Sequence, residues 1–178
     1  EVRIARANIN GDGNLETIAT MGEGGLPILR VFDGVTGAQT MEIQVYDQAF
    51  NGGIFVAIGD LGNDGILDIV TGAGPGGAPH VKVFNGATNA IISQWYAYPA
   101  SFTGGVYVAA GNTNGDAFAD VIVGAGATGG SRVQVYAGSA TGVVTTSTLN
   151  DFFAYSPAFT GGVVVAAGQR DAVAGDEI

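Results

Sequence analysis

The chain has 178 residues, of which 47% are hydrophobic, 31 are glycine and none is cysteine, and its formal net charge is −10. This length supports one sizeable hydrophobic core, whereas the acidic balance argues against nucleic acid and anionic membrane surfaces, which attract basic proteins. The lack of cysteine excludes disulfides, thiolate metal ligands and a thiol nucleophile. No apolar run approaches the roughly 18 residues of a membrane span, so membrane insertion is not expected.

The first unit covers about residues 1–53 and is predicted to contain four short strands. These are short, β-branched runs bounded by Gly, Asn and Asp, which favours strands over helices. A polar loop at 8–16 separates the first two strands, and the turn at 33–37, Asp-Gly-Val-Thr-Gly, has the chemistry of a hairpin connection between the last two. The four strands are expected near 2–5, 17–20, 29–32 and 42–46.

The same order recurs at an offset of 52 residues, and such a fixed period is typical of repeat architectures. The second unit covers about 54–105, with strands near 54–58, 69–71, 81–84 and 91–98. The third covers about 106–162, with strands near 106–110, 121–123 and 133–136 and a last one reaching Tyr155. It is five residues longer around 139–150, where we expect a longer loop.

Residues 163–178 are predicted to begin a fourth unit with an inner strand at 163–168. The loop that follows is degenerate, because Gln169 and Val173 stand where the other units suggest carboxylates. We therefore expect no strong metal site in this terminal part.

The loop at 60–68, Asp-Leu-Gly-Asn-Asp-Gly-Ile-Leu-Asp, concentrates three carboxylates between two predicted strands. Like charges this close destabilise a tight loop unless a cation neutralises them, and hard oxygen ligands at alternate positions suit Ca²⁺. Gly65 permits the left-handed backbone that would fold the loop around an ion. Related loops lie at 8–16 and 112–120. An EF-hand is excluded, because it needs a twelve-residue loop between two helices.

Residue size follows position within the unit. First strands carry small residues, as at 108–110, and fourth strands carry rings such as Trp95, Tyr96 and Tyr98. This taper suits a wedge-shaped blade of a β-propeller. Together with Gly-Gly-Val-Tyr-Val-Ala at 104–109, the aspartate loop and the glycine- and proline-rich turn at 72–79, the pattern resembles the FG-GAP (VCBS-type) repeat of integrin α-chain propellers and bacterial surface proteins.

The resemblance covers essentially the whole chain and implies an all-β fold of β-propeller blades, each a four-stranded antiparallel sheet. The chain would be a single propeller segment, 1–178, with three full blades at about 1–53, 54–105 and 106–162 and a partial blade at 163–178.

In that family, loop positions one, three, five and nine supply side-chain ligands to Ca²⁺ and position seven supplies a carbonyl. The ligands implied in the first loop are Asn8, Asn10, Asp12, Glu16 and the carbonyl of Asn14. Those implied in the second are Asp60, Asp64, Asp68 and the carbonyl of Ile66, with Gly62 removing one ligand. Those implied in the third are Asn112, Asn114, Asp116, Asp120 and the carbonyl of Phe118. Here Ala117 replaces the turn glycine, and a left-handed alanine costs about 1 kcal/mol or more.

The sequence also allows three other interpretations. The segments 72–77 and 124–129 match the G-x-G-x-x-G dinucleotide fingerprint, but that motif needs a following helix and strand-like runs follow here. Paired carboxylates could act as a glycosidase acid and base, but three copies beside turn residues fit metal ligation better. The rings of the fourth strands could stack on sugars, although their repetition favours packing between units.

These observations favour a protein that is not an enzyme: a calcium-stabilised extracellular or cell-surface module for adhesion or for binding protein or carbohydrate. Two alternatives remain open, because this fold hosts several functions. One is a structural protein that assembles blade to blade into a ring or filament, and the other is an accessory propeller of a larger extracellular enzyme. Expected partners are further copies or further blades of a longer chain, with a cell-surface protein or polysaccharide as another candidate. We expect a secreted or cell-surface location, because such loops fill most readily at extracellular calcium levels.

Overall fold

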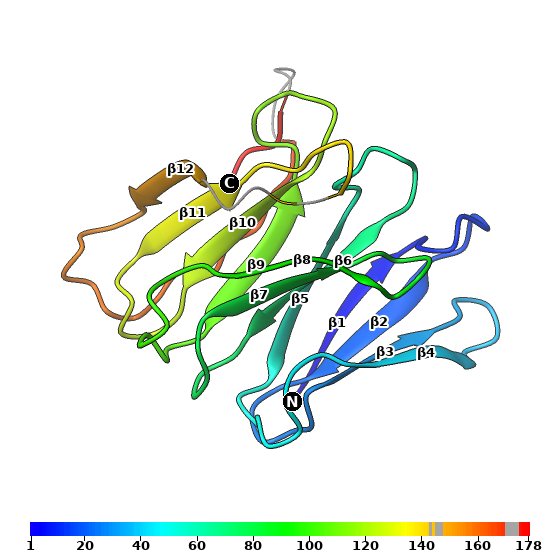
Figure 1. The fold of residues 1–178 in the computed structure, drawn as a ribbon, viewed down its shortest axis with the longest axis horizontal. Coiled ribbons are helices and arrows are strands. Elements are labelled where there is room, and N and C mark those ends of the chain that lie inside the picture. The colour runs from blue at the N-terminus through cyan, green and yellow to red at the C-terminus, as the bar shows by residue number, and fades with distance from the viewer. Residues whose placement is uncertain (143, 145–147, 170–174) are drawn as a thin grey trace.

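All twelve regular elements in the described part of the chain are β-strands, arranged as three four-stranded antiparallel sheets (Figure 1). The computed structural model describes residues 1–142, 144, 148–169 and 175–178. The first sheet contains β1 (Val2–Ala7), β2 (Glu16–Met21), β3 (Ile28–Phe32) and β4 (Gln39–Gln44). The second contains β5 (Ile54–Gly59), β6 (Asp68–Ala73), β7 (His80–Phe84) and β8 (Ile91–Tyr96). The third contains β9 (Val106–Gly111), β10 (Asp120–Ala125), β11 (Arg132–Tyr136) and β12 (Thr148–Phe153).

Within each sheet, the strands pair in chain order, so that every connection joins neighbouring antiparallel strands. The all-β prediction and the predicted strands of the three units are therefore confirmed, with boundaries shifted by a few residues. The longer loop expected around 139–150 falls partly on residues 143 and 145–147, which lie outside the described residues.

The core lies between successive sheets. Ile18, Leu29 and Val31 of the first sheet pack with Ile54 and Phe84 of the second. Between the second and third sheets, the buried side chains include two of the rings from the end of the second unit. Trp95 is only 9% exposed and lies 5.0 Å from the ring of Tyr136, and Tyr98 is 7% exposed. Packing between sheets, rather than an open sugar platform, is thus the role of these two rings.

The predicted β-propeller arrangement is not confirmed. β5 contacts both β1 and β9, so the sheets stand side by side through their first strands (Figure 1). The described sheets stay open and do not form a closed or propeller-like ring. Alternating residues and turn glycines determine each sheet locally, whereas closure depends on contacts between sheets, which the strand pattern does not encode.

The predicted inner strand at 163–168 is wrong for the described residues. Val163, Val165 and Ala167 pack against buried residues of the third sheet, and the Val163 N–H donates to the Ala125 carbonyl at 2.9 Å. The segment pairs with no strand apart from one isolated bridge between Gly168 and Glu177. A strand requires a hydrogen-bonded neighbour, and apolar packing alone does not supply one.

The dinucleotide interpretation is excluded by the connection that follows β6. Gly74, Gly76 and Gly77 form a turn that leads directly into β7, and a strand leaves no helix N-terminus to receive a pyrophosphate. The described residues contain no helix long and apolar enough to cross a membrane.

Candidate metal centre in the loop between β1 and β2

Glu16 is the buried carboxylate of the first loop. It is the first residue of β2 and is only 2% exposed. Its Oε2 accepts the backbone N–H of Ile9 at 2.9 Å, but its Oε1 is buried without a hydrogen-bond partner, and so is Oδ1 of the neighbouring Asn8. A buried oxygen without a partner costs free energy that a bound cation would recover.

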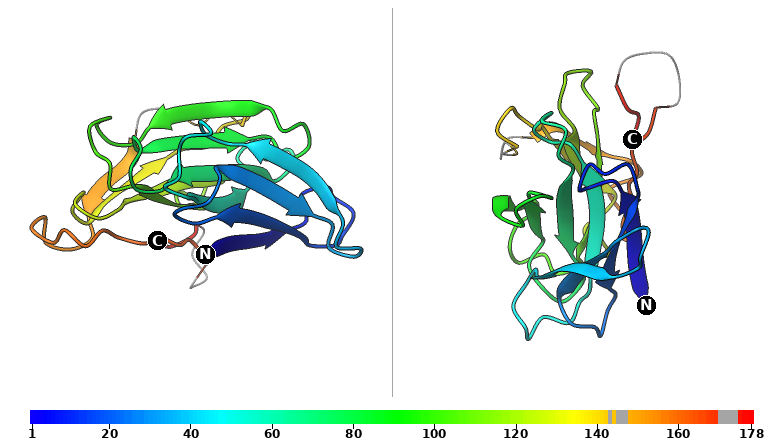
Figure 2. Two further views of the ribbon diagram at one scale, coloured as in Figure 1. Left: turned by 90° about the horizontal axis from the view of Figure 1, so that it is seen from below. Right: turned by 90° about the vertical axis from the view of Figure 1, so that its right-hand side faces the viewer.

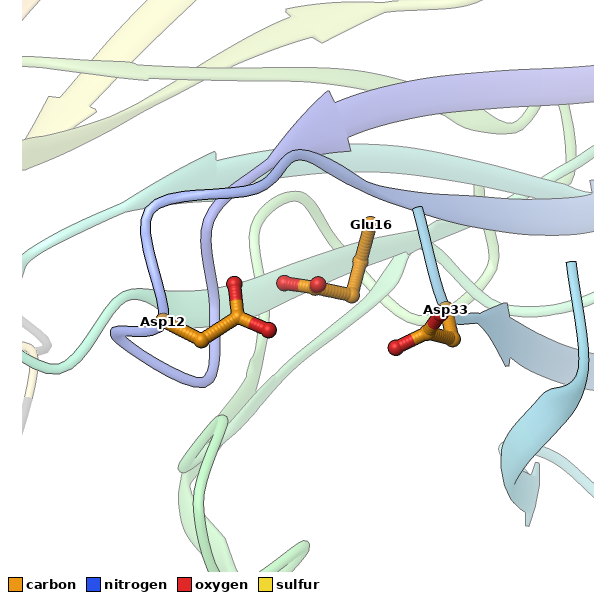
Figure 3. A group of neighbouring side chains, drawn as sticks. All are labelled: Asp12, Glu16 and Asp33. Atoms are coloured by element: carbon orange, nitrogen blue, oxygen red, sulfur yellow. The ribbon is translucent and has the colours of Figure 1, made fainter. Parts of the chain in front are cut away.

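Two further carboxylates lie close to that of Glu16. One carboxylate oxygen each from Asp12, Glu16 and Asp33 lies within 4.8 Å of the others. Figure 3 shows Asp12 and Asp33 on either side of Glu16 in this view. Asp12 comes from the exposed tip of the loop, where its Oδ1 also accepts the Asn14 N–H at 2.7 Å. In the described residues, this is the group of three acidic side chains that could share one ion.

Asp33 reaches the loop because the turn after β3 packs directly against it. A Cβ atom on Gly34 would lie 2.2 Å from the Leu15 carbonyl oxygen, so this approach requires glycine. The Asp33 Oδ1 accepts the N–H of Thr36 at 2.6 Å and its hydroxyl at 2.7 Å. These hydrogen bonds, led by that of the hydroxyl, hold the pKa of Asp33 below its ordinary value and keep the carboxylate ionised.

Asp33 was not among the predicted ligands, because Asp-Gly-Val-Thr-Gly is ordinary turn chemistry. A comparison of the three sequence units could have identified Asp33. The positions equivalent to Asp33 are Asn85 and Ala137, so the first unit alone carries a carboxylate there.

The donor set suits a hard cation. It contains three carboxylates, and the same loop holds the buried, unpartnered Asn8 Oδ1; oxygen donors of this kind are the ligands of Ca²⁺. Asn10 belongs to the loop rather than to this group, since its Oδ1 accepts the Asp12 N–H at 2.9 Å. Of the five ligands predicted in this loop, the structure therefore brings Asp12 and Glu16 together, while the buried Oδ1 of Asn8 has no hydrogen-bond partner.

In the second loop, Asp60 and Asp64 accept hydrogen bonds from the backbone of the loop itself. The two oxygens of Asp60 accept the N–H groups of Asp64 at 3.1 Å and Gly65 at 3.0 Å. Asp64 Oδ1 accepts the Ile66 N–H at 2.8 Å. The sequence predicted that Asp60, Asp64, Asp68 and the Ile66 carbonyl surround one ion. The three carboxylates do not form a group comparable to that of the first loop. Their role as ligands stays a prediction.

Asp68 is the buried member of the second loop, at 3% exposure. Its Oδ2 accepts the Leu61 N–H at 3.3 Å. Burial raises the pKa of Asp68 to about 6, and the negative charges of Asp64 and Asp60 contribute to the rise. This carboxylate therefore carries an uncompensated electrostatic cost at neutral pH, which a cation or a proton would relieve.

The third loop is also closed by its own hydrogen bonds. Asp120 is fully buried, and its Oδ2 accepts both the N–H (2.9 Å) and the hydroxyl (2.6 Å) of Thr113. Asn114 donates to Asp116 Oδ2 at 2.8 Å, and Asp116 Oδ1 accepts the Phe118 N–H at 2.7 Å. Asn112 also contributes to closure, because its Oδ1 accepts the Gly115 N–H at 2.9 Å. The five predicted ligands thus lie in one loop, and ion binding by them stays a prediction.

The backbone separates the third loop from the other two. Gly13 and Gly65 adopt φ values of +89° and +81°, as expected for Gly65 from the sequence. Ala117 occupies the equivalent position but is not among the residues with positive φ. The expectation of a left-handed alanine is therefore wrong, because the loop avoids that strain by a different backbone path.

Comparison with known proteins gives likeness of fold only. No protein-family profile matches the sequence, and no curated protein matches it. The solved structure of the exotype rhamnogalacturonan lyase YesX resembles this chain with a TM-score of 0.66 and 13% identity, over 97% of this chain and 37% of the lyase. The rhamnogalacturonan lyase YesW gives a TM-score of 0.59 and 12% identity, over 84% of this chain and 33% of the lyase. The chain thus spans about a third of the length of the structures it matches.

These findings correct the FG-GAP interpretation. No FG-GAP profile matches, the structural neighbours are rhamnogalacturonan lyases, and the described sheets form no propeller. The properties implied by that resemblance, including cell adhesion and repeated calcium loops, lose its support. A metal site in this protein consequently rests on the geometry around Glu16, and the similarity to the lyases establishes the fold.

Proposed function

We propose that this chain is a non-catalytic, cation-stabilised accessory module of a larger extracellular enzyme that acts on polysaccharide. The observation that carries the proposal is the match of almost the whole chain, 97%, to about a third of a rhamnogalacturonan lyase. A second lyase matches in the same partial way. An accessory module explains this relation better than adhesion does, because adhesion was an implication of the corrected family resemblance.

The carboxylates around Glu16 give the proposed cation a structural role. The three carboxylates come from three different segments of the first unit: the tip of the loop, the start of β2 and the turn after β3. An ion bound by Asp12, Glu16 and Asp33 would tie these segments together, and Ca²⁺ is the cation whose ligand preference they fit. Because these oxygens converge only in the folded chain, binding would stabilise the fold.

A turnover assay tests the non-catalytic part. The isolated chain should release no unsaturated product from rhamnogalacturonan, as followed by ultraviolet absorbance in the presence of Ca²⁺. A matched Asp60→Asn or Asp116→Asn variant should be indistinguishable from the unmodified chain. Robust turnover that disappears in either variant would contradict the proposal.

Affinity electrophoresis tests the polysaccharide partner. The chain should migrate more slowly in a native gel that contains rhamnogalacturonan than in a gel without polysaccharide. Polygalacturonate is the control, because it carries a carboxylate on every residue and no rhamnose. Equal migration in all three gels would contradict rhamnogalacturonan as the partner.

A further inference from the structure

Among the described residues, nothing covers one face of the first sheet. β6 and β10 are buried at all six of their positions, whereas β2 alternates between buried and more exposed residues. The uncovered side contains a hollow of about 410 Å³, whose lining includes Val2, Met21, Leu26, Ile28 and Arg30. Met21 is 40% exposed and Leu26 is 50% exposed, so this face presents apolar side chains to water.

In the other two sheets, a short segment from the preceding sheet covers this face. We call it the aromatic hook: a tyrosine, three residues, a phenylalanine, one residue and two glycines, at 46–53, 98–105 and 155–162. In each hook the phenylalanine N–H donates to the carbonyl three residues earlier, at 2.8–2.9 Å. The tyrosine and phenylalanine rings also meet edge to face, with centroids 5.4, 5.7 and 5.9 Å apart.

The first two hooks dock on the next sheet in the same way. The Tyr46 hydroxyl donates to the carbonyl of His80, the first residue of β7, at 2.9 Å. The Tyr98 hydroxyl donates to the carbonyl of Arg132, the first residue of β11, also at 2.9 Å. The phenylalanines lie over glycines: a Cβ on Gly77 would stand 2.8 Å from the Phe50 ring, and Gly129 has the same relation to Phe102 at 2.7 Å.

A basic side chain completes the first of these junctions. Lys82 Nζ donates to the Val45 carbonyl at 2.7 Å and lies 5.3 Å from the centre of the Tyr46 ring. The position equivalent to Lys82 in the first sheet is Arg30, which lines the uncovered hollow. The receiving face of the first sheet thus offers the same kind of cation.

In the described part of the chain, the third hook docks on no following sheet. Tyr155 is 66% exposed and Phe159 is 48% exposed, although their rings keep the arrangement of the docked hooks. This segment, orange in the ribbon, lies at the opposite end of the molecule from β1–β4 (Figures 1 and 2). Within the 178 residues, this hook and the uncovered face therefore do not meet, whereas they are complementary between two copies.

We propose that the hook at 155–162 of one copy docks on the uncovered face of β1–β3 of a second copy. The Tyr155 hydroxyl would donate to the Ile28 carbonyl, the equivalent of His80 and Arg132, with Arg30 beside the ring. Phe159 would lie over Gly25, where the Met21 side chain now stands, with Sδ 3.2 Å from the position of a Cβ on that glycine. Methionine is unbranched and flexible, so its side chain can change conformation and leave space for the phenylalanine ring.

Docking in this register also displaces residues 163–167. They lie beside the third sheet as β5 and β9 lie beside their preceding sheets: a Cβ on Gly124 would stand 2.3 Å from the Val163 carbonyl oxygen, and one on Gly72 would stand 2.5 Å from that of Val106. The β1 strand of the second copy needs the same place. Val164 is 74% exposed and the segment joins no sheet, so its release costs less than the release of a paired strand.

The contact is head to tail, which joins two different surfaces and can extend beyond a dimer. Sedimentation equilibrium of the full chain over a range of concentrations tests it. The unmodified chain should associate reversibly. Tyr155→Ser in the hook and Leu26→Asp in the receiving face should each weaken association at least roughly tenfold, since exposed apolar anchors dominate such contacts. Val35→Ser, which changes an exposed residue in a turn, is the matched control and should have no effect.

Mixing the two weakened variants makes the test specific. The Leu26→Asp copy keeps a working hook and the Tyr155→Ser copy keeps a working face, so an equimolar mixture should form a discrete one-to-one dimer that cannot extend. Val165→Asp, which loosens the segment that must move, should strengthen association of the otherwise unmodified chain. A chain that stays monomeric at every concentration, or a mixture that stays monomeric, would overturn the proposal, which does not depend on the proposed enzymatic context.

Discussion

The loops at 8–16 and 60–68 occupy the same place between the first two strands of their sheets, yet they differ as candidate cation sites. Both contain a left-handed glycine and both end on a buried acidic residue. In the first loop, Glu16 keeps an oxygen without a partner and meets Asp33. In the second loop, Asp60 and Asp64 accept backbone N–H groups of the loop, and Asn85 stands in place of Asp33. A similar loop therefore does not make a similar site, because a residue from the turn after the third strand decides it.

The largest effect is expected from Glu16→Gln. Ca²⁺ at about 100 times its dissociation constant stabilises the folded protein by about 2.7 kcal/mol, which corresponds to a rise of roughly 5–10 °C in melting temperature for a chain of this size. The variant should lose most of this rise, since it removes the charge of the central ligand. Thermal unfolding in Ca²⁺ and in EGTA measures it. Glu23→Gln, in an exposed turn, is the control and should keep the full rise.

Exchanging the residues Asp33 and Asn85 between the two turns should exchange the relative Ca²⁺ affinities of the two loops. Asp33→Asn should weaken Ca²⁺ binding about tenfold, as expected for the loss of one charged ligand worth about 1.4 kcal/mol. The turn itself should survive, because Asn85 already accepts the N–H of Thr88 at 3.0 Å and its hydroxyl at 2.9 Å, as Asp33 does with Thr36. The reverse change, Asn85→Asp, should strengthen binding at the second loop. Calcium titration calorimetry of both variants checks the pair, and unchanged affinities would show that the turn residue is irrelevant.

A smaller effect concerns Asp68 and pH. Its folded-state pKa of about 6 lies above the ordinary 3.8, so the folded state binds this proton more tightly than the unfolded state. Without cation, its contribution to stability should fall as pH rises from about 4 to about 6 and stay low above that. Asp68→Asn should remove this dependence and raise the melting temperature in EGTA at pH 7 by a few °C, because solvent screening reduces the electrostatic cost of the ionised carboxylate. A melting temperature at pH 7 equal to or below that of the unmodified chain would contradict it.

The smallest effect tests the difference in backbone conformation between the second loop, at Gly65, and the third loop, at Ala117. Gly65→Ala forces alanine to a φ near +81° and should cost about 1 kcal/mol, or roughly 2–4 °C in melting temperature. No atom lies within 4 Å of the added Cβ, so the cost is conformational rather than steric. Ala117→Gly should give no stabilisation, since Ala117 is not left-handed. Stabilisation by that change would restore the strained alanine that the sequence suggested.

The strands could be predicted from the sequence because their signals are local. Runs such as Ile-Phe-Val-Ala-Ile before the second loop, with turn residues at their ends, leave few alternatives to short antiparallel strands. Closure into a propeller could not be predicted, since residue size along the unit fixes no contact between distant sheets. The strand expected at 163–168 failed for a related reason: its apolar residues pack, but hydrogen bonding needs a neighbour that the pattern does not supply.

Only part of the candidate site could be predicted from the sequence. Asp12 and Glu16 stand out by their spacing within one loop, whereas Asp33 is separated from Glu16 by two strands and reaches it through the close approach of Gly34 to Leu15. Which carboxylate oxygens remain unpartnered also depends on side-chain length. Glu16 leaves one oxygen free, whereas the oxygens of Asp120 accept hydrogen bonds from Thr113 and Gly138.

The most direct measurement is isothermal titration calorimetry with Ca²⁺, carried out after metal has been removed with EGTA. It compares the unmodified chain with the Glu16→Gln and Asp68→Asn variants. The unmodified chain should bind Ca²⁺ with its tightest site lost in Glu16→Gln and retained in Asp68→Asn. Absence of binding to the unmodified chain at millimolar Ca²⁺, or a tightest site that survives Glu16→Gln, would contradict the account of the first loop as the cation centre.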